Sequence, residues 1–296
     1  MQIGGLEIHL ITDGVTHVDV GGPFGLVPRA LYSKYFQPDH LNRVPMTLVS
    51  MVIRSAGFTL LVDTGLGRKL DSKEIEYWGL ERPGGGLAEE LTRLGLTPED
   101  IDLVVNTHLH SDHCGGNTIR EGDQVRATFP NATYVVQRME WADFANPDVR
   151  TKGTYLHENF TPVLEAGQAR MLHGDTELTE EVHCVVTPGH TRGHQSVLLK
   201  SGDWRGLIVG DLASYSVLMN RTSWLTAYDV DPLQNLSTKQ IWQKWALDHD
   251  AWLFFPHDPI TPVARLKSEN GRLSLDPIEG LQDLIVSAPI QRQPRE

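Results

Sequence analysis

The sequence feature that most constrains this chain is a six-residue segment of the pattern H-x-H-x-D-H, formed by His108, His110, Asp112 and His113. It follows Ile101–Val105, a short apolar run of the kind that forms a buried strand. On nearly extended backbone, side chains two positions apart share a side, so the first two histidines can reach one cation while Asp112 and His113 turn toward a second. With 13 histidines in 296 residues, composition alone would produce such a string in only roughly two of a thousand chains. The segment therefore indicates a site for two metal ions.

Three more candidate ligands stand just beyond apolar runs elsewhere in the chain. They are His190, Asp211 and His257, which follow predicted strands over 182–186, 205–209 and 252–255. A single Asp or His at a strand end is commonplace, and for Asp211 or His257 taken alone a structural role is the better interpretation. Their joint recurrence favours one shared site, in which the Asp211 carboxylate is suited to bridge two cations.

Asp63 ends another predicted strand, 58–62, in the sequence D-T-G-L-G. It could orient a ligand histidine, because a metal-bound imidazole usually donates its other N–H to an acceptor. An Asx-turn that only ends the strand explains the same residue, and on local sequence alone it is the favoured interpretation.

Charge balance and cysteine content restrict the class of protein. The 38 acidic and 26 basic residues give a net charge of -12, which argues against a broad basic surface for nucleic acid or an anionic membrane. Only two cysteines, Cys114 and Cys184, are present, and Met1–Gly5 lacks the charged and apolar parts of a signal peptide. No apolar run approaches the length that spans a bilayer. We expect a cytoplasmic protein with a single domain over residues 1–296.

The spacing of apolar residues predicts the remaining elements. A strand over Leu6–Thr12 precedes a long irregular stretch, 13–45, rich in Gly, Pro and aromatic residues. Such a loop is typical of a pocket lid or a subunit contact, which makes a homodimer one option, although ordinary packing over the core explains it equally well. A helix over Ser237–Asp250 is predicted from its S-x-x-Q capping box. Further elements are a hairpin over 46–62, helices over 87–94 and 138–145, and strands over 133–136 and 196–200.

These residues together resemble the signature of the metallo-β-lactamase superfamily, H-x-H-x-D-H followed by H, D and H, over residues 46–258. The resemblance implies an α/β (α+β) fold of four layers, an αββα sandwich in which two mixed β-sheets pack face to face between helices. It implies one metal held by His108, His110 and His190, a second held by Asp112, His113 and His257, and a bridging Asp211. It also implies that Asp63 lies behind the ligands and that His194 is a structural support.

A site of this kind is suited to hydrolysis. Two cations about 3.5–4 Å apart can share a hydroxide, lower its pKa and polarise the bond under attack, so no serine or cysteine nucleophile is needed. Two divalent cations against Asp112, Asp211 and one hydroxide leave one net positive charge to receive the negative transition state. Asp112 could also handle the proton of the nucleophile. The ligand types favour zinc, with iron, manganese or cobalt as alternatives.

Individual residues separate the branches of the superfamily. Di-iron oxygen reductases place a Glu where His110 stands, and true β-lactamases depart at the bridging position that Asp211 keeps. RNA-processing relatives would need a basic arm, and type II glyoxalases carry a helical region beyond the last ligand, where only 39 residues, 258–296, remain here. A non-catalytic binding module is disfavoured because every ligand is present.

What remains resembles the lactonase, arylesterase and phosphotriesterase branch, which includes acyl-homoserine lactonases and methyl-parathion-type hydrolases. Lactonases place a tyrosine shortly after the bridging Asp to assist the substrate carbonyl, and Tyr215 stands one residue later than that pattern. We therefore expect a binuclear hydrolase in which Asp112, Asp211 and Tyr215 act on the ester-type bond of a small molecule. A lactonase or arylesterase is the favoured interpretation, and a phosphotriesterase (organophosphate hydrolase) or another phosphoester hydrolase is the alternative.

Overall fold

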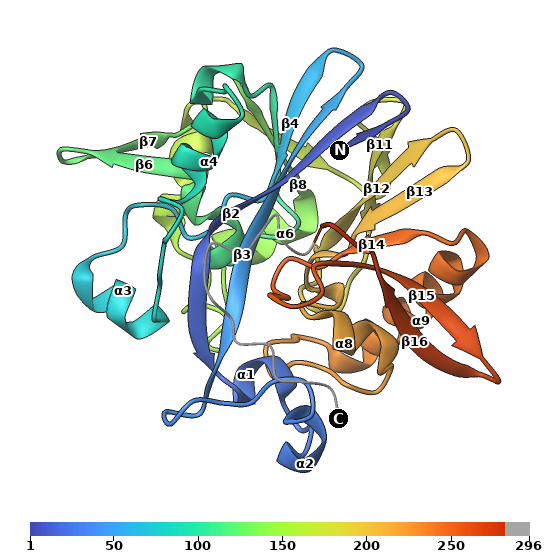
Figure 1. Cartoon of the computed structure of the whole chain (residues 1–296). Helices are drawn as coiled ribbons and strands as arrows, with labels where there is room; N and C mark the ends of the chain where they lie inside the picture. Colours follow the sequence, from blue (N-terminus) through green and yellow to red (C-terminus); the bar gives the residue numbers. More distant parts are fainter. Residues whose placement is uncertain (282–296) are drawn as a thin grey trace.

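The computed structural model describes residues 1–281 and contains two seven-stranded β-sheets packed face to face (Figure 1). The first sheet has the order β1-β2-β3-β4-β5-β8-β9, with β1 (Gln2–Ile3), β2 (Leu6–Asp19), β3 (Arg43–Ser55), β4 (Phe58–Val62), β5 (Leu103–Val105), β8 (Thr133–Gln137) and β9 (Ala169–Leu172). The second runs in chain order through β10 (Thr176–Glu177), β11 (Val182–Val186), β12 (Gln195–Ser201), β13 (Trp204–Ile208), β14 (Trp252–Phe254), β15 (Val263–Glu269) and β16 (Arg272–Pro277). A separate hairpin joins β6 (Thr118–Glu121) to β7 (Gln124–Ala127).

Helices cover the outer face of each sheet, which confirms the predicted αββα layering. The first sheet carries α4 (Leu87–Arg93), α6 (Arg138–Ala145) and α7 (Thr161–Glu165), and the second carries α8 (Ser216–Asn220) and α9 (Pro232–Asp248). A short α3 (Ser72–Trp78) lies between β4 and α4. Among residues 1–281, no helix has the length and apolarity needed to cross a membrane.

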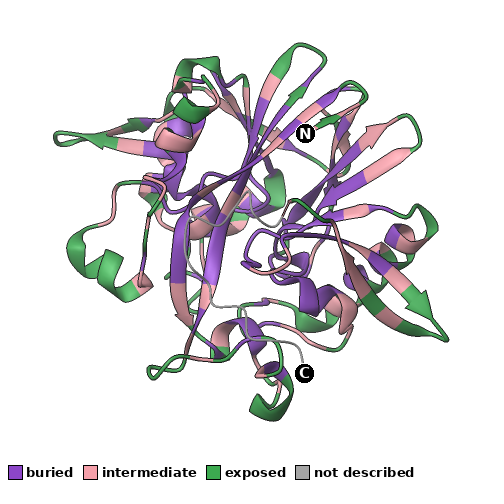
Figure 2. Ribbon diagram, viewed as in Figure 1, coloured by how far each residue is buried: buried purple, intermediate pink, exposed green. Residues whose placement is uncertain are grey.

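The apolar core lies between the sheets because alternate residues of each strand point to the same side. Leu6, Ile8 and Leu10 of β2 pack in this way against residues such as Val197 and Leu199 of β12. Figure 2 shows the same arrangement as buried strand centres and exposed hairpin tips.

Parallel pairing brings four strand ends to one edge of the sandwich. β4 pairs in parallel with β5, and β13 pairs in parallel with β14, so each pair delivers its carboxyl ends to the same place. Asp63 follows β4, the H-x-H-x-D-H segment follows β5, Asp211 follows β13 and His257 follows β14. The topology thus collects the predicted site residues at one edge.

The predicted bounds of the irregular stretch 13–45 are wrong at both ends. β2 continues to Asp19 through a β-bulge between Thr12 and Val15, and β3 begins at Arg43. Asp13-Gly14 has the local chemistry of a turn, but pairing with β3 on both sides of the bulge holds the chain extended. Between the strands lie α1 (Gly21–Phe24) and α2 (Arg29–Tyr32), and the Phe24 ring stacks on Tyr32 with centroids 5.3 Å apart.

The predicted start of the last long helix is also wrong. α9 begins at Pro232, where the Asp231 side chain accepts a hydrogen bond from the Gln234 backbone N–H. Proline is well suited to the first helical turn, because a backbone N–H at that position would have no acceptor within the helix. Ser237 therefore lies inside the helix, and its hydroxyl donates to the Leu233 carbonyl in place of forming a capping box.

A buried ion pair fixes the β2 bulge to the loop behind the ligand edge. The Asp13 carboxylate is buried and accepts hydrogen bonds from the Gly67 N–H at 3.0 Å, the Leu87 N–H at 3.2 Å and Arg82 Nη2 at 2.8 Å. The close approach of Asp13 needs a glycine at position 65, since a Cβ there would lie 2.4 Å from the Asp13 Cβ. One side chain therefore holds β2, the segment after Asp63 and the start of α4 together.

We predict that Asp13→Ala lowers the free energy of unfolding by about 3 kcal/mol, because it leaves the Arg82 guanidinium and two backbone N–H groups without their buried acceptor. Denaturant titration followed by circular dichroism measures the change. Glu121→Ala, which removes an exposed partner of Arg126, is the control and should match the unaltered protein. Equal unfolding midpoints for the two variants would contradict the role assigned to Asp13.

Candidate metal centre

The ligand segment changes from extended to helical backbone between its second histidine and its aspartate. His110 has φ -67° and ψ 150°, and the one-turn helix α5 (Ser111–Cys114) begins directly after it. The His110 carbonyl accepts hydrogen bonds from the N–H groups of His113 and Cys114, which fixes this turn. Asp112 therefore leaves the side shared by the two preceding histidines, as the spacing predicted.

The first group of candidate ligands consists of His108, His110 and His190. Nδ1 of His110 lies 3.0 Å from Nε2 of His108 and 3.1 Å from Nε2 of His190. Burial, followed by the neighbouring imidazoles, holds the pKa of His108 and His110 well below the usual range. Both rings are therefore neutral, and each keeps a nitrogen lone pair for a cation.

The second group consists of Asp112, His113 and His257. Nε2 of His113 lies 3.0 Å from Nε2 of His257, and the latter lies 3.5 Å from Oδ2 of Asp112. Burial lowers the pKa of His113, but the carboxylates of Asp112, Asp63 and Asp211 outweigh it and raise this pKa to about 10. The surroundings of His113 therefore favour a positive charge, which either a proton or a metal cation supplies.

Asp211 stands between the two groups. Its Oδ2 lies 3.3 Å from Nε2 of His190, and its Oδ1 lies 3.3 Å from Nε2 of His257 and 3.6 Å from Nε2 of His113. Oδ1 is buried and makes no hydrogen bond with any residue in 1–281. A buried carboxylate oxygen without a partner is costly unless a cation satisfies it. This position fits the bridging role that the sequence predicted.

The hydrogen bonds behind the histidines determine which nitrogens face the site. Nδ1 of His113 donates to Asp63 Oδ2 at 2.8 Å, and Nδ1 of His257 donates to the Thr47 carbonyl at 2.7 Å. If both rings were neutral, each would have only the N–H that it gives to the acceptor behind it, and the two Nε2 atoms that face each other at 3.0 Å would both be acceptors. Two acceptors at this distance repel each other, and a shared cation removes the repulsion. The raised pKa of His113 reflects the same need for a positive charge between them. The donor set therefore fits a metal ion.

Two predictions about supporting residues are confirmed. Asp63 accepts from His113, and it also accepts from the Thr107 backbone N–H and hydroxyl, both at 2.8 Å. His194 is buried, and its Nε2 accepts a hydrogen bond from the Asp211 backbone N–H at 2.9 Å. His194 thus positions the backbone of the bridging residue and belongs to neither ligand group.

Sequence reasoning missed two buried carboxylates that support the ligands. Asp229 Oδ1 accepts from Nδ1 of His190 at 3.0 Å, so it does for His190 what Asp63 does for His113. Glu140 accepts from the Leu109 N–H at 2.9 Å and from the Thr191 hydroxyl, and so joins two ligand loops. Neither residue stands beside a ligand in the sequence, and Glu140 has the surroundings of an ordinary residue on a surface helix. No local signal could have identified them.

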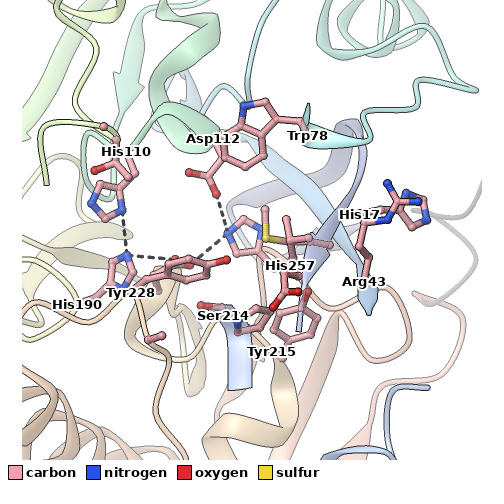
Figure 3. Close-up of a pocket in the computed structure, with 18 of the residues that line it drawn as sticks. His17, Arg43, Trp78, His110, Asp112, His190, Ser214, Tyr215, Tyr228 and His257 are labelled. Carbon is pink, nitrogen blue, oxygen red and sulfur yellow. Dashed lines mark hydrogen bonds and ion pairs between the residues drawn. The ribbon is translucent and has the colours of Figure 1, made fainter. Parts of the chain in front are cut away.

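A cavity of about 600 Å³ opens onto the two groups (Figure 3). Asp112, Asp211 and His257 line it together with residues of β2, β3 and α3. Tyr215 also lines the cavity, but its phenol is fully buried and donates to the Pro45 carbonyl at 3.0 Å. Its predicted contact with the substrate stays a prediction. His157 is exposed and lies outside both groups.

Known proteins provide comparisons for this geometry. Residues 45–257 match the model of the Metallo-beta-lactamase superfamily. The N-acyl homoserine lactonase AttM of Agrobacterium fabrum is 29% identical over 191 residues, which cover 62% of this chain and 68% of that protein. An N-acyl homoserine lactonase of Bacillus cereus is 32% identical over 201 residues, which cover 64% of this chain and 72% of that protein.

Solved structures agree with the architecture. A probable metal-dependent hydrolase from Staphylococcus aureus superposes with a TM-score of 0.85 and 29% identity, covering 94% of this chain and 99% of that one. The dizinc quorum-quenching lactonase AidC, in complex with the product N-hexanoyl-L-homoserine, gives a TM-score of 0.77 and 20% identity, covering 94% and 96%. The second likeness establishes the shared fold alone.

We predict that the metal-replete protein contains two divalent ions per chain, measured by elemental analysis after gel filtration. Asp211→Ala should lower the content toward one, because it removes the only carboxylate in contact with both groups within residues 1–281. His157→Ala, at an exposed histidine, should leave two ions. A content that never exceeds one ion, and that Asp211→Ala does not change, would overturn the binuclear site.

We also predict that Asp63→Asn weakens metal binding by about 10–100-fold, because the His113 N–H loses its charged acceptor. Competition with a chelating dye measures the affinity. Asp102→Asn is the matched control, since Asp102 accepts from the Thr59 N–H at the opposite end of β5. An affinity that is the same in both variants would show that Asp63 does not act on the metal site.

Proposed function

The chain belongs to the metallo-beta-lactamase superfamily, and from this premise we propose that it is a binuclear metal-dependent hydrolase that cleaves lactones. The observation that carries the proposal is the pair of facing imidazole nitrogens, Nε2 of His113 and Nε2 of His257, at 3.0 Å, with His257 lining a cavity large enough for a small molecule. Oδ1 of Asp211, which has no hydrogen-bond partner within residues 1–281, also supports it.

The proposed ligands form two groups, which follow from the distances between their ligand atoms. His108, His110 and His190 hold one divalent ion, Asp112, His113 and His257 hold the other, and Asp211 is shared. Zinc is the proposed metal, because imidazole and carboxylate ligands suit it. When bound, the two ions acidify water and polarise the carbonyl under attack.

Asp112 is the proposed proton carrier of the site. Its side chain is 15% exposed and borders the cavity, whereas the histidines of both groups are almost fully buried. A carboxylate in that place can accept a proton from the attacking water and return it to the departing alkoxide oxygen. Asp63 and Asp229 stay behind the ring nitrogens of His113 and His190, where they hold the imidazole orientation while the proton moves.

Uncharged esters fit the cavity better than polyanions do. Apolar side chains, among them Met46 and Trp78, line it together with the polar groups of the site, and the net charge of -12 disfavours highly anionic substrates. The names of the lactonases that this chain resembles point to the same class of substrate. Phosphotriesters, which are uncharged and tetrahedral at phosphorus, are the proposed secondary substrates.

We propose a homodimer in the cytoplasm. Leu26, Leu31 and Leu41 are exposed on the segment between β2 and β3, and this concentration of exposed leucines on one segment supports a protein contact there. Both cysteines are free and buried, which suits a reducing compartment. Light scattering should give twice the chain mass of 33.1 kDa, and a value equal to one chain would exclude the dimer.

The substrate class is tested by one panel on the purified, metal-replete protein. We expect hydrolysis of N-acyl homoserine lactones, weaker hydrolysis of aryl esters and phosphotriesters, and loss of all three activities after chelation. Return of activity when the metal is restored distinguishes metal loss from unfolding. Efficient turnover of a phosphodiester or a β-lactam beside inert lactones would overturn the lactonase assignment and leave the metallohydrolase assignment standing.

A further inference from the structure

A tyrosine that sequence analysis did not single out borders the cavity of the metal centre. Tyr228 lines the cavity together with His110, His190 and His257, and its ring lies between His190 and His257 in the close-up (Figure 3). The residue is 43% exposed, so its ring is open to a molecule in the cavity. It belongs to the segment Thr226–Val230, between α8 and α9.

No described residue forms a hydrogen bond with the hydroxyl of this tyrosine. Whereas the Tyr215 hydroxyl donates its proton to the Pro45 carbonyl, the Tyr228 hydroxyl has no hydrogen-bond partner among residues 1–281. Burial raises the pKa of the Tyr228 phenol above its ordinary value, so the hydroxyl keeps its proton and is a hydrogen-bond donor at physiological pH. Of the two tyrosines, Tyr228 is therefore the one with a donor available to a substrate.

The backbone on both sides of Tyr228 is held in place. Nη2 of Arg150 donates to the Ala227 carbonyl at 2.6 Å and to the Asp229 carbonyl at 2.9 Å, so one guanidinium clamps both neighbours. The Asp229 side chain accepts from Nδ1 of His190 at 3.0 Å. The backbone position of Tyr228 is thus linked through Asp229 to a candidate metal ligand. A group that must reach a reacting bond needs a fixed position of this kind.

A glycine of α1 leaves the space that the phenol occupies. The Gly22 carbonyl accepts a hydrogen bond from the Ala227 N–H at 2.8 Å, and a Cβ added at Gly22 would lie 1.8 Å from the Tyr228 hydroxyl oxygen. Any other residue at position 22 would have to displace the Tyr228 ring. Through the contact between Gly22 and Tyr228, the segment between β2 and β3 therefore affects where the phenol lies.

We propose that Tyr228 is the phenol that contacts the bond being cleaved, donating a hydrogen bond to the substrate carbonyl oxygen as negative charge develops on that oxygen. The inference rests on the proposed ester-cleaving function and names one of its catalytic residues. The phenol keeps its proton throughout, and the hydrogen bond strengthens as the carbonyl carbon becomes tetrahedral. Gly22 and Arg150 are positioning residues, because they act through Tyr228.

The first experiment compares Tyr228→Phe with Tyr215→Phe on one N-acyl homoserine lactone. Tyr228→Phe should lower kcat by about 10²–10³-fold, the usual effect of removing one such donor, with little change in KM. Its metal content and thermal midpoint should equal those of the unaltered protein, because the hydroxyl has no partner to lose. A loss of kcat in Tyr215→Phe alone, with full turnover by Tyr228→Phe, would overturn the assignment.

The second experiment moves the phenol without deleting it. Gly22→Ala should lower kcat, as Tyr228→Phe does, because the added methyl group would overlap the Tyr228 hydroxyl. In the double variant Gly22→Ala/Tyr228→Phe the two losses should not add, because both act on one contact. Fully additive losses in kcat would show that Gly22 does not act through Tyr228.

The activity of the unaltered protein separates failure of this inference from failure of the proposed function. If lactones are inert and an aryl ester is hydrolysed, the lactonase assignment fails, and the same variants test Tyr228 on the aryl ester. If the unaltered protein hydrolyses an ester and Tyr228→Phe does so equally well, only the inference fails. If no ester is hydrolysed by the metal-replete protein, both fail.

Discussion

The structure depends on two imidazole nitrogens, Nε2 of His113 and Nε2 of His257, that face each other and need a positive charge between them. Nε2 of His113 and Nε2 of His257 are 3.0 Å apart, and each ring has already given its N–H to an acceptor behind it. Without a metal ion, only a proton on His113 could supply this charge, and Oδ1 of Asp211 would still have no hydrogen-bond partner within residues 1–281. A cation bound at this edge resolves both problems, so metal binding stabilises the same arrangement that it needs for chemistry.

The acceptors behind the histidines link that arrangement to the whole fold. Asp63 follows β4 in the first sheet, Asp229 precedes α9 beside the second sheet, and the Thr47 carbonyl belongs to β3. Groups from both halves of the sandwich therefore meet behind one cluster of ligands. A displacement of either sheet would change the direction in which an imidazole lone pair points, which is why packing far from the cavity matters to the site.

The sequence was sufficient for the candidate ligands and for Asp63 behind them, and insufficient for the other supporting groups. His190, Asp211 and His257 each follow an apolar run, and that local signal, together with the resemblance to a known family, predicted the seven candidate ligands that the structure brings together. Asp229 and Tyr228 carry no such signal, because their positions follow from contacts with Arg150 and Gly22, which are distant in the chain. The length of β2 was missed for the same reason, since cross-strand pairing overrides the turn tendency of Asp13-Gly14.

Anomalous diffraction from crystals of the metal-replete protein locates metal ions independently of activity. Two anomalous peaks about 3.5–4 Å apart are expected on either side of Asp211. One should lie among His108, His110 and His190, and the other among Asp112, His113 and His257. A single peak, or no peak within this cluster at full metal loading, would show that the centre is not binuclear.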